Sequence, residues 1–200
     1  MIRKSVIKIL CRFARKPAAK LYRVVEEWAE RETRRMAVSQ FGGCGDNITI
    51  GKGLNVINPG NVFLGNHVFI GSGAHLLAGN APIRIGSKVM LAGEVAIITG
   101  NHNTGVVGRP MFDVKEKRPF DDMPVVIEDD VWIGFRAVLL KGTKVGRGSV
   151  IGAGAVVMGK VPPYSVVAGN PARVLFTRFD RMTINRHESN LKQQRVEEGW

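Results

Sequence analysis

The sequence predicts an all-β solenoid flanked by helices, and three observations lead to this fold class. An aliphatic residue recurs every six positions, a second small residue follows each one four positions later, and glycine or alanine often comes directly after the aliphatic residue. A helix repeats every 3.6 residues and a strand every two, so neither explains this period. Short internal repeats are typical of solenoids, in which stacked repeats bury a continuous core.

The repeat is clearest in the second half of the chain, where both repeating positions are expected to point inward. The aliphatic series is Ile127, Ile133, Leu139, Val145, Ile151 and Val157, and the small series is Val131, Ala137, Thr143, Ser149, Ala155 and Val161. Upstream, the same template occurs at Leu64, Ile70, Leu76, Ile85, Leu91 and Ile97. The glycines mark corners that need backbone freedom or a missing side chain. Three hexapeptides, roughly 18 residues, would close one triangular coil.

The period is interrupted twice, and each interruption predicts a segment that leaves the solenoid. Nine residues rather than six separate Leu76 from Ile85, which indicates a small loop around residues 79–82. Thirty residues separate Ile97 from Ile127, so residues 103–124 are expected to form a long projecting loop. Long loops are often functional, and this one directly follows Asn101 and His102. The alternative, a dispensable surface insertion, is less favoured.

The N-terminal segment, residues 1–44, is a different kind of sequence. Apolar residues recur at helical spacing on both sides of Pro17, which predicts two amphipathic helices. Residues 1–41 carry eleven Lys or Arg against four Glu, a net +7 of the chain's +12. This basic face suits peripheral contact with an anionic membrane. Packing as a cap on the solenoid or on a neighbouring subunit is equally consistent.

Other classes of segment fit the N-terminal sequence less well. Lys8 and Arg12 interrupt the apolar core that a signal peptide needs, and no apolar run approaches the length of a membrane span. Nucleic-acid binding is not expected, because the basic residues come without an aromatic platform or a binding motif. Cys11 and Cys44 are expected to be free thiols, which favours a cytoplasmic location. A peripheral location on the cytoplasmic face of the inner membrane is also consistent with the basic N-terminal segment.

The predicted organisation therefore has three parts. Residues 1–44 form the basic helical segment, residues 45–172 form the solenoid with its loop at 103–124, and residues 173–200 form a C-terminal tail. Within that tail the stretch 179–198 lacks Gly and Pro and predicts a helix. His187 lies in this stretch and is interpreted as an ordinary surface residue.

His102 is the candidate catalytic residue. The repeat fixes its backbone while the long loop can cover it, and a near-neutral imidazole can accept a hydroxyl proton. A histidine in a turn is otherwise more often a structural hydrogen-bonding residue. Several acids could orient the imidazole, but each fits a solvated loop charge better, so none is assigned; they are Glu94, Asp113, Asp121 and Asp122.

Motifs in the solenoid carry a resemblance to a known family. They are residues 129–134 (DDVWIG), 141–146 (KGTKVG), 152–157 (GAGAVV) and 161–173 (VPPYSVVAGNPAR), together with residues 100–102 (GNH) and 58–61 (NPGN). The sequence resembles the hexapeptide-repeat acyltransferases over roughly residues 45–176. Within them it is most similar to capsular and lipopolysaccharide O-acetyltransferases, and more distantly to maltose, galactoside and xenobiotic acetyltransferases.

The resemblance implies a left-handed parallel β-helix and a homotrimer with active sites in the grooves between neighbouring subunits. Acetyl-CoA would run along the coils, and no metal is expected. Matched position by position, the cofactor contacts would be Trp132, Phe135, Ala153 and Arg173, the last near the nucleotide phosphates. Many relatives have Thr-Lys where this chain has Met158-Gly159, so Lys160 is the candidate substitute.

The implied function is direct acetyl transfer from acetyl-CoA to a hydroxyl of a saccharide, in a cell-surface polysaccharide or its nucleotide- or lipid-linked precursor. His102 would take the hydroxyl proton, Asn101 would contact the acceptor, and a backbone N–H would stabilise the oxyanion. An antibiotic hydroxyl is the alternative acceptor. Two other classes remain: a non-catalytic scaffold, and a metal-dependent lyase resembling γ-class carbonic anhydrases. His67, His75 and His102 do not have that family's spacing.

Overall fold

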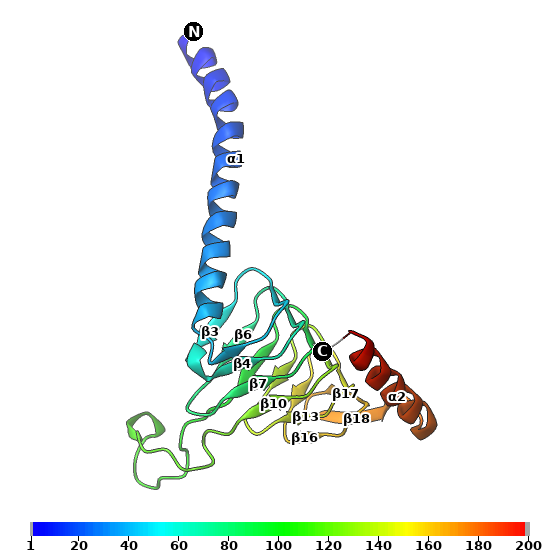
Figure 1. Ribbon diagram of the computed structural model, residues 1–200. Coiled ribbons are helices and arrows are strands. Elements are labelled where there is room, and N and C mark those ends of the chain that lie inside the picture. The colour runs from blue at the N-terminus through cyan, green and yellow to red at the C-terminus, as the bar shows by residue number, and fades with distance from the viewer. Residues whose placement is uncertain (1, 199–200) are drawn as a thin grey trace. The chain divides into compact units, whose positions relative to one another are not determined.

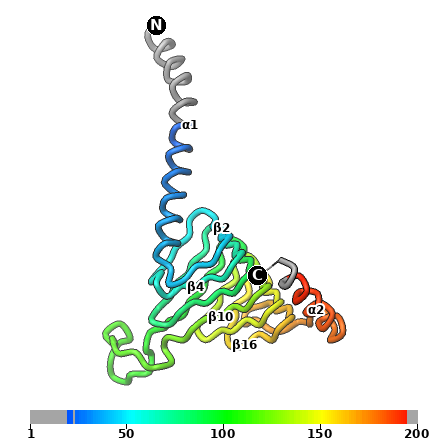
Figure 2. Tube along the Cα trace, viewed as in Figure 1, coloured from blue at the N-terminus to red at the C-terminus, as the bar shows by residue number. Residues whose placement is uncertain are grey.

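The computed structural model describes the backbone of residues 2–198 and the side chains of residues 20–22 and 24–194. The chain divides into two units, Met1–Ser39 and Gln40–Trp200. Figure 2 traces both along the chain. Each is described separately below.

The first unit is one helix, α1 (Ile2–Ser39). The prediction of two helices separated near Pro17 is therefore wrong. A proline inside a helix removes one backbone hydrogen bond and can bend the helix without ending it.

Apolar side chains lie exposed along the described part of α1. Leu21, Val24, Val25 and Trp28 are each more than half exposed. They recur at three- and four-residue steps and so share one face of the helix. The corresponding predicted stripe from Ile2 to Phe13 lies outside the described side chains. Among the described residues, no helix is both long enough and apolar enough to cross a membrane.

The second unit is a parallel β-solenoid of about six coils, built from three sheets (Figure 1). Sheet A contains β1 (Gly43–Cys44), β4 (Val62–Leu64), β7 (Ile83–Ile85), β10 (Val125–Ile127), β13 (Lys144–Val145) and β16 (Lys160–Val161). Sheet B contains β2 (Thr49–Ile50), β5 (Phe69–Ile70), β8 (Met90–Leu91), β11 (Trp132–Ile133), β14 (Val150–Ile151), β17 (Ser165–Gly169) and β18 (Ala172–Thr177). Sheet C contains β3 (Asn55–Ile57), β6 (His75–Leu77), β9 (Ala96–Ile98), β12 (Val138–Leu139) and β15 (Val156–Val157).

The register keeps equivalent residues of successive coils in line. In sheet B, Trp132 lies opposite Met90 on one side and Val150 on the other. In sheet C, Leu139 lies opposite Ile97 and Val157. All strand pairs are parallel except the last, in which β18 runs antiparallel to β17. Each inward side chain therefore stacks on the equivalent residue of the next coil.

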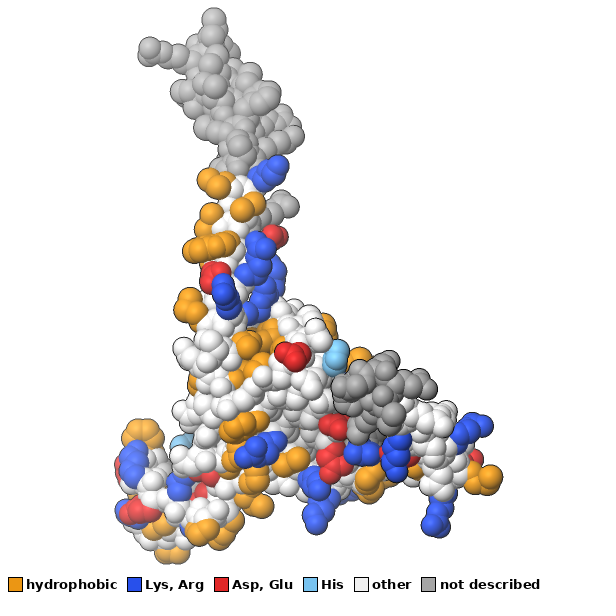
Figure 3. Space-filling view, in the orientation of Figure 1, with side chains coloured by type: hydrophobic (Ala, Val, Ile, Leu, Met, Phe, Trp, Pro, Cys, Tyr) orange, Lys and Arg blue, Asp and Glu red, His pale blue; other side chains and the backbone are white. Residues whose placement is uncertain are grey.

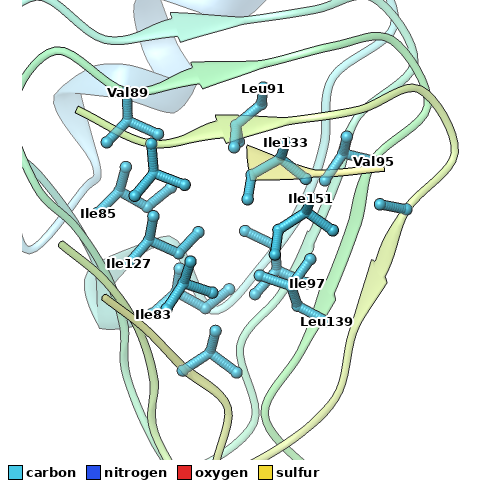
Figure 4. Packing of buried hydrophobic residues seen from close by; sticks show 14 of the residues in the cluster. Ile83, Ile85, Val89, Leu91, Val95, Ile97, Ile127, Ile133, Leu139 and Ile151 are labelled. Atoms are coloured by element: carbon cyan, nitrogen blue, oxygen red, sulfur yellow. The ribbon is translucent and has the colours of Figure 1, made fainter. Parts of the chain in front are cut away.

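The predicted inward positions form the core, which confirms the six-residue repeat. Every member of both series between residues 127 and 161 is buried, and so are the upstream members from Leu64 to Ile97. Figure 4 shows their side chains converging inside the solenoid. Thr143 and Ser149, the two polar members, are buried as well and donate their hydroxyl protons to the backbone oxygens of Val157 and Pro162.

The corner glycines are explained by the missing side chain rather than by backbone freedom. A Cβ on Gly134 would lie 2.6 Å from the backbone nitrogen of Ala153 in the next coil. The left-handed backbone conformation falls instead on the residue before most of the small inward positions, with φ of 71° at Gly73, 56° at Glu94 and 58° at Arg136. In most repeats, one residue thus allows close contact with the next coil, and a different residue bends the backbone.

The long segment between β9 and β10 projects from the solenoid (Figure 1). It contains one short 3-10 helix, η2 (Met111–Asp113). Its return to the solenoid is held by an antiparallel bridge between Gly100 and Asp122. The Met123 N–H also donates to the Thr99 carbonyl oxygen at 2.9 Å. A second 3-10 helix of the same length, η1 (Pro59–Asn61), precedes β4.

The predicted C-terminal helix is present as α2 (Arg181–Glu198). The Glu188 carboxylate accepts hydrogen bonds from Arg147, at 3.1 Å, and from the Tyr164 hydroxyl. The His187 ring packs edge-on against Tyr164 and also contacts Phe179. His187 is thus a packing residue of this helix, more buried than the sequence suggested.

Candidate active site

Asn101 and His102 lie where the chain leaves the solenoid, just after β9 at the corner between sheets C and A. Both side chains are exposed and line two hollows that meet at them. One hollow, of about 550 Å³, is bounded mainly by the long loop. The other, of about 490 Å³, runs along sheet C past Ile57, Leu77 and Ile98. A group held at His102 can therefore be approached from two sides.

The backbone that leads to His102 is held by buried hydrogen bonds. The Thr99 hydroxyl accepts from the Gly79 N–H at 2.7 Å and donates to the Ala81 carbonyl oxygen at 2.9 Å. Two residues later, the Asn101 N–H donates to the Asp121 carbonyl oxygen at 2.8 Å. The small loop at 79–82 and the end of the long loop therefore clamp the same stretch of chain.

An ion pair with a buried carboxylate supports that clamp. Asp121 is 1% exposed, and its carboxylate accepts from the Arg118 guanidinium at 2.8 Å and from the Arg118 backbone N–H, also at 2.8 Å. The hydrogen bonds from Arg118 lower the pKa of Asp121 to about 2, and burial opposes them. The same contact raises the pKa of Arg118. Asp121 is therefore charged at neutral pH, and its carboxylate forms an ion pair with Arg118.

The other acids near the site are also engaged, except Asp113. Asp122 accepts from Lys117 at 2.7 Å and from Asn80 at 2.7 Å. Glu94 pairs with Arg136 at 2.6 Å. Asp113 is exposed in η2. Within the described part of the chain, none of these carboxylates is hydrogen-bonded to His102, so the structure assigns no orienting acid.

The residues proposed to contact the cofactor fall mainly on the other side of the solenoid. Trp132 points outward from β11 and is 50% exposed. Phe135 and Ala153 lie at the corner between sheets B and C, where the Gly154 N–H donates to the Phe135 carbonyl oxygen at 2.8 Å. Arg173 is exposed on β18, opposite Ala168 of β17. None of the four lines either hollow at His102.

Lys160 lies apart from those four residues. It is exposed on β16 in sheet A, in register with Lys144 of β13. Together with Glu128 and Pro162 it lines a third hollow of about 320 Å³. Within one chain, the structure therefore brings His102 and Asn101 together and leaves the candidate cofactor residues on two other surfaces.

The three solenoid histidines are not arranged as a metal site. His67 occupies a left-handed turn after β4, and His75 is exposed on β6, where its ring nitrogen lies 3.2 Å from the Asn55 amide. No group of three His, Cys, Asp or Glu suited to a metal ion occurs among the described residues.

Comparison with known proteins gives this geometry its context. Residues 124–159 match the family model described as bacterial transferase hexapeptide (six repeats). The chain is 32% identical over 136 residues to WbbJ of Escherichia coli K12, named as a lipopolysaccharide biosynthesis O-acetyl transferase, covering 66% of this chain and 69% of that one. It is 30% identical over 168 residues to the yeast protein YJL218W, named as an acetyltransferase, covering 82% and 81%. The chain belongs to the hexapeptide-repeat acetyltransferases.

Solved structures of this acetyltransferase family share the fold. A hexapeptide-repeat acetyltransferase from Vibrio cholerae, solved with acetyl-CoA, is 30% identical with a TM-score of 0.65, covering 76% of this chain and 79% of that one. A maltose O-acetyltransferase from Clostridium difficile is 29% identical with a TM-score of 0.62, covering 74% and 75%. The predicted family and solenoid fold are thereby confirmed.

In this acetyltransferase, the loop residues that shape the larger hollow are not evident from the sequence. They are Met111, Phe112, Arg118 and Phe120, joined by Lys141 from the turn after β12. The available signal was the presence of two phenylalanines, two methionines and three valines in the loop at 103–124. That signal alone gives no indication of which way the loop folds.

Proposed function

We propose that this acetyltransferase transfers an acetyl group from acetyl-CoA to a hydroxyl of a saccharide, with His102 as the general base. The donor follows from the family, in which the related Vibrio cholerae enzyme was solved with acetyl-CoA. A saccharide acceptor is supported by relatives named for lipopolysaccharide biosynthesis and for maltose.

The observation that carries the proposal is the position of His102 between two hollows. Direct transfer needs a base that touches the acceptor hydroxyl while the donor thioester reaches the same point. His102 is exposed to both hollows, and the hydrogen bonds of Thr99 and Asn101 fix its backbone. A donor in one hollow and an acceptor in the other would meet at its ring.

The reaction is a single acyl transfer. The acceptor oxygen attacks the thioester carbonyl as its proton passes to His102, and a backbone N–H stabilises the resulting oxyanion. The C–S bond then breaks, and the proton held on His102 passes to the departing sulfur, which leaves as the thiol of coenzyme A. No covalent enzyme intermediate forms, so no side-chain nucleophile is needed.

We further infer that the complete site needs a second copy of the chain in a homotrimer. His102 lies at the corner between sheets C and A, whereas Trp132, Phe135 and Ala153 lie on the sheet B side. Acetyl-CoA would run between His102 of one subunit and the Trp132 side of the next, with Lys160 and Arg173 near its phosphates and Asn101 near the acceptor. Mass measurement by light scattering should give three copies.

Mixed trimers test this arrangement directly. Co-refolding His102→Asn with Trp132→Ala should restore roughly a quarter of wild-type activity, because random assembly pairs an intact His102 with an intact Trp132 at that frequency. If both residues served one site within the same chain, the mixture would stay as inactive as its two components.

The location of the reaction is part of the proposal. We infer that residues 1–41 bring the enzyme to an anionic membrane surface on the cytoplasmic side. The exposed face at Leu21, Val25 and Trp28 and the basic composition support this. Sedimentation with anionic vesicles should fall for Trp28→Ser with Leu21→Ser, and equal sedimentation of wild type and variant would contradict it.

The experiment for the chemistry is release of free thiol from acetyl-CoA with a panel of sugars and hydroxylated antibiotics. Acceptor-dependent release should fall by about 100-fold or more in His102→Asn, the scale of lost general-base catalysis. His67→Asn is the matched control, because His67 lies in a solvent-facing turn whose φ of 56° asparagine tolerates. Equal rates in the two variants would remove His102 from its role. An antibiotic as the only productive acceptor would move the enzyme to the xenobiotic class.

A further inference from the structure

The larger hollow beside His102 has features that restrict the acceptor, and this inference rests on the proposed function. Its volume of about 550 Å³ falls within the range of small-molecule sites. Phe112 is 85% exposed and Phe120 55% exposed, although both are large and apolar. Aromatic faces of this kind provide apolar area against which the C–H groups of a sugar ring can pack. The loop therefore offers an aromatic surface next to the proposed base.

The charge in this hollow is unbalanced. Its lining contains two permanent cations, Arg118 and Lys141, and one carboxylate, Asp121. That carboxylate accepts hydrogen bonds from the Arg118 guanidinium and from the Arg118 backbone N–H. Lys141 donates to the Phe120 carbonyl oxygen, and no ion pair joins it to a carboxylate among the described side chains. A half-buried ammonium group thus faces the hollow with donor capacity left over.

Further cations continue from Lys141 along the outward face of sheet A. Lys144 begins β13, Lys160 lies opposite it on β16, and Arg84 projects from β7 over the Phe63 ring at 4.4 Å. Glu128 pairs with Lys144 at 3.0 Å. In Figure 3, Lys and Arg side chains lie over the part of the solenoid where β7, β13 and β16 are labelled in Figure 1. The surface next to the hollow is therefore basic.

We propose that the acceptor is an acidic saccharide, one that carries a carboxylate or a phosphate group within a sugar ring's length of the acetylated hydroxyl. The ring would pack against Phe112 and Phe120, the anionic group would bind the Lys141 ammonium, and the reacting hydroxyl would face His102. A longer acidic chain would continue over Lys144. Lys141 is then a specificity residue that selects charged acceptors over neutral ones.

Matched acceptors test the proposal. The methyl glycosides of glucose, galactose and mannose serve as neutral probes, the corresponding methyl glycosiduronic acids add a carboxylate, and the three hexose 1-phosphates add a phosphate. For at least one sugar, wild-type kcat/KM should favour a charged probe by about tenfold or more, the scale of one charge-assisted hydrogen bond. If the glycosiduronic acids give the higher kcat/KM, the recognised group is a carboxylate. If the hexose 1-phosphates give the higher value, it is a phosphate.

The variant Lys141→Gln should bring this preference close to one while leaving the KM for acetyl-CoA unchanged. Lys192→Gln, on the exposed face of α2, is the matched control and should keep the preference. A raised KM for acetyl-CoA with an unchanged acceptor preference would assign Lys141 to the donor and overturn the proposal. Neutral probes acetylated as well as charged ones would overturn it too, with the proposed function intact. No His102-dependent transfer to any probe would count against both.

Discussion

The solenoid core and the loop at 103–124 are held in place in opposite ways. In the core, Ile133 stacks between Leu91 and Ile151, and each coil repeats the same contact. In the loop, the contacts are individual and polar, such as the Arg118–Asp121 pair and the bond from Asn101 to the Asp121 carbonyl oxygen. The difference teaches that the stability of the solenoid is spread over many equivalent core residues, whereas the position of the loop depends on single contacts.

The largest expected effect on stability comes from opening the core. Ile133→Ala should lower the free energy of unfolding by about 2 to 5 kcal/mol, because a fully buried side chain is lost and a cavity remains. Val138→Ala is the control, since Val138 points outward from β12 and is only half-buried. Denaturant unfolding measures both. Equal losses would contradict the inward and outward assignment.

The loop should respond through activity rather than stability. Asp121→Asn should lower kcat by roughly 10-fold or more while changing the KM for acetyl-CoA little, because the loss frees Arg118 and loosens the clamp on Asn101. Asp113→Asn, in η2, carries the same chemical change at an exposed site. An equally large fall in kcat for Asp113→Asn would show that the Arg118–Asp121 ion pair is not what positions His102.

Acid should weaken the loop before the core. The pKa of Asp121 falls from an ordinary 3.8 to about 2 on folding, so the ionised carboxylate stabilises the folded state above pH 3.8. That stabilisation decreases as the pH falls toward 2. The protection factors of loop amides, calculated against the intrinsic exchange rate at each pH, should fall between pH 4 and 2 more steeply in the wild type than in Asp121→Asn. Parallel profiles would mean that the carboxylate does not anchor the loop.

The smallest expected effect concerns an exposed ion pair at the corner between sheets B and C. Arg136→Ala removes the contact with Glu94, and both side chains are largely in solvent. Such pairs contribute about 0.2 to 1 kcal/mol. Thermal unfolding should therefore shift only slightly, and less in high salt. A loss as large as that of Ile133→Ala would mean that corner charges, rather than the stacked core, hold the coils together.

The sequence predicts the core because a solenoid makes burial a local property. The spacing of Ile127, Ile133 and Leu139 alone identifies the residues that point inward, and the break after Ile97 locates the loop beside His102. The prediction of two helices around Pro17 is wrong because one proline can bend a helix without ending it.

The shape of the hollow follows from contacts between residues distant in the sequence. Phe120 meets Lys141 across 21 positions, and no period connects them. The path of a loop depends on such tertiary contacts, so its lining could not be predicted from the spacing of the repeats. His102 as the general base stays a prediction, which rests on its place between the end of β9 and the long loop.

The reversal at β18 has a consequence for the length of the solenoid. A parallel coil exposes a strand edge onto which one more coil can be added, and in principle a second molecule could supply it. In sheet B the edge after β17 is occupied by β18, which runs in the opposite direction. An incoming coil would meet a strand of the wrong polarity. The final hairpin thus opposes the addition of a further parallel coil at the sheet B edge.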